Sequence, residues 1–311
     1  MNSDSKNLVS TGLVSSSLTS HQTVLLDETI DGLLLKRGNT VVDATVGLGG
    51  HAEKISVAIG KEGTLLALDG DPRSLARARA RLQSAEAKII FVQGNFRNLK
   101  KIAVEAGIRS AEGIVFDLGW HLEQLTEGLG LSFQKDELLL MNLSLPSGIT
   151  AKDIIANWNE EDLASIFTQY GEERFAKRIA RAIVTARREK PIQTSLELAA
   201  IISAAVPGFY RRGRIHPATR TFQALRIAVN DELSALTEGL EDALSLLAHG
   251  GRVAVISFHS LEDRIVKRAF RKAEDEGYGM RITKKPIVAG EGERKKNPRA
   301  RSAKLRIFEK K

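Results

Sequence analysis

The chain has 311 residues, a formal net charge of +8 at pH 7 and no cysteine. This length accommodates one α/β domain with an insertion, or two domains. The lack of cysteine excludes disulfides, thiolate metal sites, iron–sulfur clusters and every reaction that requires a cysteine nucleophile.

The first 20 residues are rich in serine and threonine and poor in charge. They lack the apolar core of a signal peptide and the arginine-rich amphipathic helix of a transit peptide. We therefore expect residues 1–20 to form a disordered tail. No apolar run in the sequence approaches the length of a membrane span. These features predict a cytoplasmic protein that has no membrane partner.

A glycine-rich turn links the first two apolar, strand-like runs. Residues 40–42 lead into Asp43, and the turn at residues 47–50 precedes a helix-like segment. The second run, residues 64–68, ends at Asp69, whose carboxylate can accept hydrogen bonds from the two hydroxyls of a ribose. Glycines in such a turn let the backbone approach a ligand. The unit is therefore typical of a site for an adenosine-containing cofactor.

Two cofactors are compatible with this turn. Gly47, Gly49 and Ala52 satisfy the dinucleotide fingerprint, with Asp69 at the required distance, so an NAD(P)-dependent oxidoreductase is one alternative. Asp43 favours S-adenosylmethionine (SAM), because a carboxylate repels a pyrophosphate but attracts the ammonium and sulfonium groups of SAM. The spacing D-x-x-x-G-x-G also resembles the first motif of SAM-dependent methyltransferases. A turn that binds no ligand is the third alternative.

Three further strand-like runs follow, at residues 88–92, 113–116 and 252–258. Apolar strands that alternate with helices are typical of a doubly wound α/β sheet with parallel strands. Ligands of such sheets bind at the carboxyl ends of the strands. The side chains expected at this edge are Asp43, Asp69, Asn95, Phe96, Asp117, Ser257, Phe258 and His259.

More than a hundred residues separate the fourth and fifth runs, too many for a single crossover. Apolar residues recur at helical spacing over residues 153–170 and 172–188, and one long helix is expected over residues 217–248. We predict an inserted, mostly helical domain that shapes substrate access. Its expected bounds are residues 126–213, and residues 21–125 and 214–311 are expected to form the sheet domain.

The positive charge is concentrated at the carboxyl end. Residues 251–311 contain 18 lysine and arginine residues against 8 aspartate and glutamate residues, and the first 250 residues contain 28 against 30. This asymmetry favours a polyanionic partner, with a solvated basic tail as the alternative. The side chains expected to contact phosphates are Lys284, Lys285, Arg294, Lys295, Lys296, Arg299, Arg301 and Lys304.

Several long runs of sequence resemble those of one enzyme family. They include H-Q-T-V-L-L-D-E from His21, H-P-A-T-R-T-F-Q-A-L-R-I-A-V-N-D-E-L from His216, S-F-H-S-L-E-D-R-I-V-K-R from Ser257 and N-P-R-A-R-S-A-K-L-R from Asn297. With the glycine turn, these runs make the chain similar to the RsmH (MraW) family, bacterial methyltransferases that act on 16S ribosomal RNA. The resemblance extends over nearly all of residues 21–306.

The resemblance implies a SAM-dependent methyltransferase fold with a helical insertion. It also implies transfer of a methyl group from SAM to N4 of a cytidine, nucleotide 1402, in the 16S rRNA of the small ribosomal subunit. A hydrogen bond from that amino group to Asp117, or to a nearby backbone carbonyl, would orient the nitrogen lone pair toward the methyl group. The residues expected to bind SAM are Asp43, Gly47, Gly49, Gly50, His51, Asp69, Phe96, Asp117 and Gln124.

The segment from Trp120 to Asn142 departs from the family pattern. After Gly119 the family usually has V-S-S-P-Q-L, where this chain has W-H-L-E-Q-L. An acid and an arginine of the family are replaced by Leu140 and Asn142. Because this segment should border the target base, one hypothesis is an altered acceptor pocket in which Trp120 stacks on the base. The other is a catalytically impaired homologue that binds SAM and RNA during ribosome assembly. The sequence leaves open whether the protein is a monomer or a homodimer.

Overall fold

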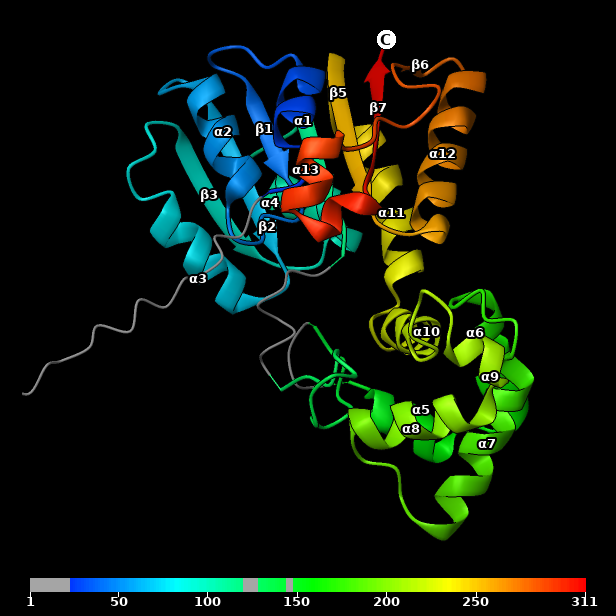
Figure 1. Cartoon of the computed structure of the whole chain (residues 1–311). Coiled ribbons are helices and arrows are strands. Elements are labelled where there is room, and N and C mark those ends of the chain that lie inside the picture. The colour runs from blue at the N-terminus through cyan, green and yellow to red at the C-terminus, as the bar shows by residue number, and fades with distance from the viewer. Residues whose placement is uncertain (1–22, 120–127, 144–147) are drawn as a thin grey trace, which may run out of the picture.

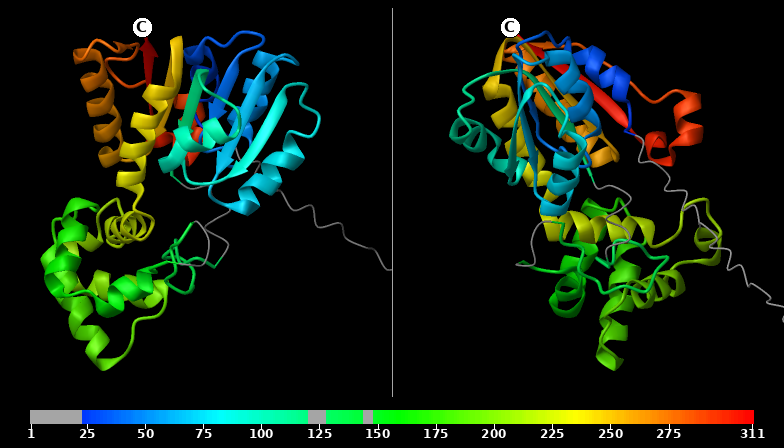
Figure 2. Two further views of the ribbon diagram at one scale, coloured as in Figure 1. Left: turned by 180° about the vertical axis from the view of Figure 1, so that it is seen from behind. Right: turned by 90° about the vertical axis from the view of Figure 1, so that its left-hand side faces the viewer.

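A computed structural model describes residues 23–119, 128–143 and 148–311 of the chain. These residues form one seven-stranded sheet with helices on both faces, and a second group of helices lies beyond one edge of the sheet (Figures 1 and 2). Within these ranges no helix is both long enough and apolar enough to cross a bilayer.

The strand order is β3-β2-β1-β4-β5-β7-β6. The five strands from β3 to β5 are parallel, whereas β7 pairs antiparallel with both β5 and β6. The predicted doubly wound α/β sheet is confirmed, but it is mixed rather than wholly parallel. Between β6 and β7 the chain packs on the face of the sheet that also carries residues 26–33, and β7 then lies between β5 and β6 (Figure 1). The strands are β1 (Thr40–Asp43), β2 (Thr64–Asp69), β3 (Lys88–Gln93), β4 (Ala111–Asp117), β5 (Leu247–Ser257), β6 (Gly279–Arg281) and β7 (Lys304–Lys310).

The central strands are apolar throughout because both of their faces are buried. Val41 and Val115 point into one core, and Val42 and Ile114, one residue away, point into the other. Helices α1 (Leu26–Leu33), α2 (Gly50–Ile59) and α3 (Pro72–Arg81) cover the first core. The opposite face is covered by α4 (Leu99–Glu105), α11 (Glu232–Leu246) and α12 (Ser260–Asp275).

The second group of helices has a core of its own. Ile154, Phe167, Ile179, Ile202 and Leu225 are all buried within it. Leu225 belongs to α10, which carries the chain back toward the sheet, so this core extends past residue 213. The division of the chain at residues 126 and 213 stays a prediction. The helices are α5 (Ala151–Asn157), α6 (Glu160–Gln169), α7 (Ala176–Glu189), α8 (Ser195–Ala205), α9 (Gly208–Arg211) and α10 (Thr219–Asn230).

Two helices expected to be continuous are broken. The segment 153–170 divides into α5 and α6, because Asn159 accepts a hydrogen bond from the Asp162 amide at 2.8 Å and starts a new helix. The segment 217–248 divides into α10 and α11 at Asp231, whose φ of 47° lies in the left-handed region. Its last residues, 247 and 248, already belong to β5.

Candidate active site

A cleft of about 900 Å³, including the open space at its mouth, lies at the carboxyl ends of β1, β2 and β4. The helices of the second group lie beyond this edge of the sheet (Figure 1). Most of the predicted cofactor residues line the cleft, together with one residue predicted to contact RNA. The predicted residues that line it are Gly47, Gly50, His51, Asp69, Phe96, Asp117 and Arg299.

The glycine turn needs glycine for conformation and for packing. Gly47 and Gly49 have φ values of 50° and 82°, in the region that side chains disfavour. Gly49 does not line the cleft, and a Cβ there would lie 3.4 Å from the Cα of Ala78 on α3. At Gly50 a Cβ would lie 1.8 Å from Oγ1 of Thr23, so glycine lets the N-terminal segment close over the start of α2.

Asp69 connects the backbone turn at Gly47 to the turn at Asp71 through its two carboxylate oxygens. Its Oδ2 accepts a hydrogen bond from the Gly47 amide at 2.8 Å, and its Oδ1 accepts one from the Asp71 amide at 2.9 Å. Burial raises the pKa of Asp69 to about 6, although these backbone donors oppose the shift. Each carboxylate oxygen has a second lone pair for a ligand hydroxyl.

Asp43 lies beneath the cleft rather than in its wall. The side chain is buried, and Oδ1 accepts a hydrogen bond from the Thr45 amide at 3.2 Å. Burial raises the pKa of Asp43 to about 8, and the charges of Asp117 and Asp69 add to the rise. In the ligand-free protein at neutral pH, Asp43 is therefore largely protonated. Its role in the cofactor site stays a prediction.

His51 and Asp117 face each other at the start of α2 and the end of β4. Nδ1 of His51 lies 3.7 Å from Oδ2 of Asp117. Burial lowers the pKa of His51, which keeps its imidazole neutral at pH 7 even though Asp117 opposes the shift. Oδ1 of Asp117 is buried and has no hydrogen-bond partner within the described ranges. A buried carboxylate oxygen of this kind fits a ligand that brings a donor or a positive charge.

A second cleft, of about 970 Å³, adjoins the first. Gly119 and Arg299 line both clefts, so the two are neighbours. The rest of its wall combines side chains from the sheet edge and from the second group of helices. It is lined by the apolar residues Leu131, Phe133, Met141, Phe222 and Phe258 and by the polar residues Thr219, Gln223, Arg226, His259, Glu262 and Ser302. Within this set the sequence indicated only Phe258 and His259, by their place after a strand, and Arg299.

Ion pairs stabilise the polar side of the second cleft. Arg226 on α10 makes two hydrogen bonds, of 2.8 and 2.9 Å, with Glu232 at the start of α11. Glu262 on α12 accepts a hydrogen bond from the Phe258 amide at 2.8 Å and lies 3.2 Å from Nε2 of His259. Burial raises the pKa of Glu262, but His259, the Phe258 amide and Arg226 outweigh it, and the pKa falls below its usual range.

Carboxylate oxygens of Glu232 and Glu262 and a ring nitrogen of His259 lie within 4.8 Å of one another, close enough to share a metal ion. Arg226 already forms an ion pair with Glu232, and its positive charge also acts on Glu262. A metal cation at this point would be repelled by that guanidinium and is therefore disfavoured. His259 and Glu262 of this cluster line the second cleft, and Glu232 pairs with Arg226, which also lines it.

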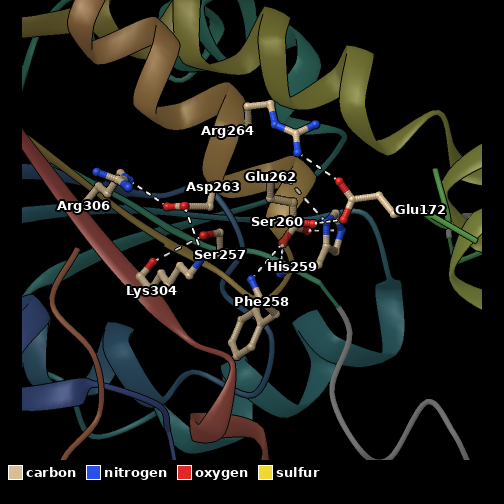
Figure 3. Close-up of polar contacts among 10 residues, drawn as sticks. All are labelled: Glu172, Ser257, Phe258, His259, Ser260, Glu262, Asp263, Arg264, Lys304 and Arg306. Atoms are coloured by element: carbon tan, nitrogen blue, oxygen red, sulfur yellow. Dashed lines mark hydrogen bonds and ion pairs between the residues drawn. The ribbon is translucent and has the colours of Figure 1, made fainter. Parts of the chain in front are cut away.

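The first turn of α12 connects the second group of helices to β7 through side-chain contacts on both sides (Figure 3). Ser260 and Arg264 donate to the carboxylate of Glu172, which lies between α6 and α7, at 2.6 and 2.9 Å. On the other side Asp263 accepts from Arg306 at 2.7 Å and from Lys304 at 3.2 Å. The second group of helices, helix α12 and strand β7 are therefore linked to one another at this turn.

The basic residues predicted to contact RNA divide into two groups. Arg299 is partly buried between the two clefts, with its guanidinium carbon 4.8 Å from the centroid of the Phe258 ring, and Lys304 is tied to Asp263. The other six are exposed on α13 (Glu291–Lys296), on the short helix η3 (Pro298–Arg301) and on the loop before them: Lys284, Lys285, Arg294, Lys295, Lys296 and Arg301. Gln124 and Trp120 lie outside the described residues.

Comparison with known proteins gives a match over nearly the whole chain. The family described as the MraW methylase family matches residues 18–311. Among solved structures, a proposed rRNA methylase from Clostridium thermocellum shares 15% identity at a TM-score of 0.47, with 93% of this chain and 99% of that chain covered. Fibrillarin from Aeropyrum pernix, solved with bound SAM, shares 11% identity at a TM-score of 0.41, and the match covers 91% of this chain and 73% of that chain. A SAM-dependent O-methyltransferase from Thermotoga maritima shares 8% identity at a TM-score of 0.42, and the match covers 94% of this chain and 67% of that chain. These scores are too low to carry an argument about activity.

Proposed function

The chain belongs to the MraW methylase family of SAM-dependent methyltransferases, and we propose that its substrate is the cytidine at position 1402 of 16S ribosomal RNA, methylated on N4. Family membership excludes the NAD(P)-dependent oxidoreductase that the glycine turn alone had left open. The small ribosomal subunit in the cytoplasm is the proposed partner.

The observation that carries the proposal is the meeting of the two clefts. The cleft at the glycine turn has donors and acceptors for a nucleoside, and the adjoining cleft has the aromatic walls that a base requires. Gly119 and Arg299 form their shared wall, and Asp117, with its unsatisfied oxygen, precedes Gly119 by two residues. A methyl donor bound in the first cleft and a methyl acceptor bound in the second would therefore approach each other beside Asp117.

The first cleft fits SAM. Asp69 is placed to accept hydrogen bonds from the ribose hydroxyls, and the turn at Gly47 lets the backbone approach the cofactor. Phe96, in the short helix η1 (Phe96–Asn98), offers a ring beside the adenine. Asp117 is placed to hold the ammonium group. When bound, SAM supplies an electrophilic methyl group.

The second cleft is the proposed acceptor site. The rings of Phe133, Phe222 and Phe258 offer faces on which a base can stack, and base–aromatic stacking contributes ~1–3 kcal/mol per base. Glu262, Arg226 and Gln223 supply the polar groups that can bind the edge of the base. The target cytidine must be unstacked to enter this cleft, as enzymes that modify bases require.

The main task of the protein in this reaction is to position the amino group in line with the methyl group. The lone pair of a cytosine amino group is delocalised into the ring, so the amine is a weak nucleophile. A hydrogen bond from N4–H to Asp117 would favour a pyramidal nitrogen with its lone pair directed at the methyl group. The proton can leave after attack, so no strongly shifted base is needed. Alignment of this kind can supply as much as ~7–11 kcal/mol of the rate acceleration.

The segment that departs from the family pattern contributes Leu131, Phe133 and Met141 to the second cleft. Met141 lines this cleft, and its backbone is fixed by Asn230, which donates to the Met141 carbonyl at 2.8 Å and accepts from the Leu143 amide at 2.9 Å. Leu139 and Met141 are buried in the core of the helices. Both the altered acceptor pocket and the catalytically impaired homologue are consistent with such a wall, and the methyl-transfer assay described below separates them.

The test is methyl transfer to immature small subunits. The protein is incubated with tritiated SAM and with subunits that lack the modification, and the labelled nucleotide is located by nuclease digestion and mass spectrometry. We expect label on N4 of cytidine 1402 and none on subunits in which that cytidine is replaced by uridine. Binding of SAM and subunits without transfer would favour the impaired homologue, and transfer to another nucleotide would reject the proposed site.

A further inference from the structure

The first cleft contains an uneven distribution of charge. Asp69, Asp71 and Asp117 line it, and of its described lining residues only His51 and Arg299 can carry a positive charge. Burial keeps His51 neutral, whereas a guanidinium stays charged in any protein environment. Arg299 is therefore the cation that this cleft offers to a ligand.

The position of Arg299 is fixed on three sides. Its backbone amide donates to Oδ1 of Asn297 at 3.2 Å, which starts the short helix η3. The next residue, Ala300, is buried in the core of the sheet domain. The guanidinium carbon lies 4.8 Å from the centroid of the Phe258 ring. A guanidinium has five N–H donors in its plane, so it can lie over an aromatic face and donate hydrogen bonds from its edge at the same time.

Arg299 lies at the end of the cleft that is away from the ribose site. The ends of β2 and β3 supply Asp69 and Asn95, whereas the ends of β1 and β4 supply the glycine turn and Asp117. The strand order β3-β2-β1-β4-β5 separates these two groups across the cleft. Burial lowers the pKa of Arg299, and Asp117 partly opposes the shift, so these two charges act on each other.

SAM carries charge of both signs at its amino-acid end. Its ammonium and sulfonium groups suit the Asp117 carboxylate, but the same carboxylate repels the carboxylate of the methionine part. A cation close to Asp117 is needed to hold that group, and arginine binds carboxylates through two parallel hydrogen bonds. We propose that Arg299 binds the methionine carboxylate of SAM, and this rests on the cofactor site proposed above. Arg299 was predicted to contact RNA; we assign it to the cofactor.

Ligands that differ only at this end of SAM test the assignment without a turnover measurement. Isothermal titration compares SAM, decarboxylated SAM and 5′-methylthioadenosine, which lacks the whole amino-acid end, on the wild-type protein and on Arg299→Gln. We expect the wild type to prefer SAM over decarboxylated SAM by ~10- to 100-fold. Arg299→Gln should remove that preference and leave the affinity for methylthioadenosine unchanged. Arg299→Lys, which keeps the charge but not the paired donors, should retain part of it.

One control variant and three contrary outcomes separate this role from others. Arg37→Gln makes the same change on an exposed arginine before β1, at the opposite end of the sheet, and should leave all three affinities unchanged. An equal loss for all three ligands in Arg299→Gln would mean that Arg299 supports the cleft structurally and would overturn the assignment. Weakened RNA binding with unchanged SAM affinity would overturn it in favour of a phosphate contact. Wild-type protein that binds none of the three ligands would reject the cofactor site itself.

Discussion

The carboxylate of Glu172 accepts a hydrogen bond of 2.6 Å from the hydroxyl of Ser260 and so connects the second group of helices to the first turn of α12 (Figure 3). Arg264, one turn further along α12, adds an ion pair of 2.9 Å to the same carboxylate. Glu172 has a φ of 49°, an uncommon conformation for a residue with a side chain. The contact fixes the helices that carry one wall of the second cleft against the sheet that carries the other.

Replacing Glu172 with Gln should weaken this connection in a pH-dependent way. The hydrogen bond from Ser260, and then the Arg264 partner, lower the pKa of Glu172. A lowered pKa contributes stability above the pKa of the unfolded chain, and that stability is lost as the pH falls through the folded value. Thermal unfolding should therefore separate the two proteins at pH 7, by no more than ~1 kcal/mol because the pair is half-exposed. The difference should vanish at acid pH. Glu161→Gln, on exposed α6, should show no such dependence.

Asp117→Asn should remove methyl transfer and weaken SAM binding. The amide keeps the shape of the side chain but loses the charge that the unsatisfied oxygen offers to the cofactor ammonium. Loss of a charged hydrogen bond lowers affinity by ~10- to 100-fold. Titration with SAM and the tritium assay measure the two effects. Asp31→Asn, on the exposed end of α1, is the matched control. A variant at Asp117 with wild-type SAM affinity and wild-type turnover would exclude it from the site.

The affinity for SAM should increase as the pH rises from about 5.5 to 7.5, below the pKa of ~7.7–8.0 of a typical α-amino group. Burial raises the pKa of Asp43 to about 8 and that of Asp69 to about 6, so the empty cleft binds protons that a cationic ligand displaces. Titration at several pH values, in buffers of different ionisation enthalpy, should detect proton release on binding. In Asp43→Asn the release should be smaller at pH 7. Because a raised carboxyl pKa destabilises the fold as the pH rises, this variant should also be the more stable one above pH 7 in the absence of SAM.

The exposed lysines of α13 should bind RNA through charge alone. Lys295→Gln with Lys296→Gln should weaken RNA binding at low salt and leave the affinity for SAM unchanged. Each lost phosphate contact should reduce the slope of log affinity against log salt by ~0.7–0.9. Filter binding over a series of salt concentrations measures the slope. Lys61→Gln, exposed in the loop between α2 and β2, is the control and should keep the wild-type slope.

The sequence was sufficient to predict that the side chains of Asp69, Phe96 and Asp117 meet in one cleft, because they come at or shortly after the ends of strands. Asp69 and Asp117 are the last residues of β2 and β4, Phe96 follows the end of β3 by three residues, and parallel strands bring their carboxyl ends together. The mixed polarity of the sheet was not predictable in this way, because a short buried strand has the same apolar composition in either direction.

The second cleft was harder to predict, because it is assembled from segments far apart in the sequence. Phe133 and Phe222 lie 89 positions apart, yet their ring centroids are 5.5 Å apart. Arg299 stands within a basic run, where lysines and arginines are usually solvated, and only the fold reveals that it is partly buried against Phe258. The break at Asp231 was missed because the apolar spacing continues across it.

That break has a consequence for how the two substrates are aligned. From Asp231, α10 leads to Phe222 and Arg226 in the acceptor cleft, and α11 leads to Gly239, where a Cβ would lie 2.9 Å from the Phe96 ring. A single bent segment of backbone therefore contacts the Phe96 ring of the first cleft and forms part of the wall of the second cleft. Arg97 pairs with Asp231 at the bend itself, and Arg226 and Glu232 brace it on the other side. The angle between α10 and α11 at Asp231 therefore helps to set the distance between the Phe96 ring and the Phe222 wall of the second cleft. A substitution at Arg97 or Asp231 would change this angle without changing a side chain that lines either cleft.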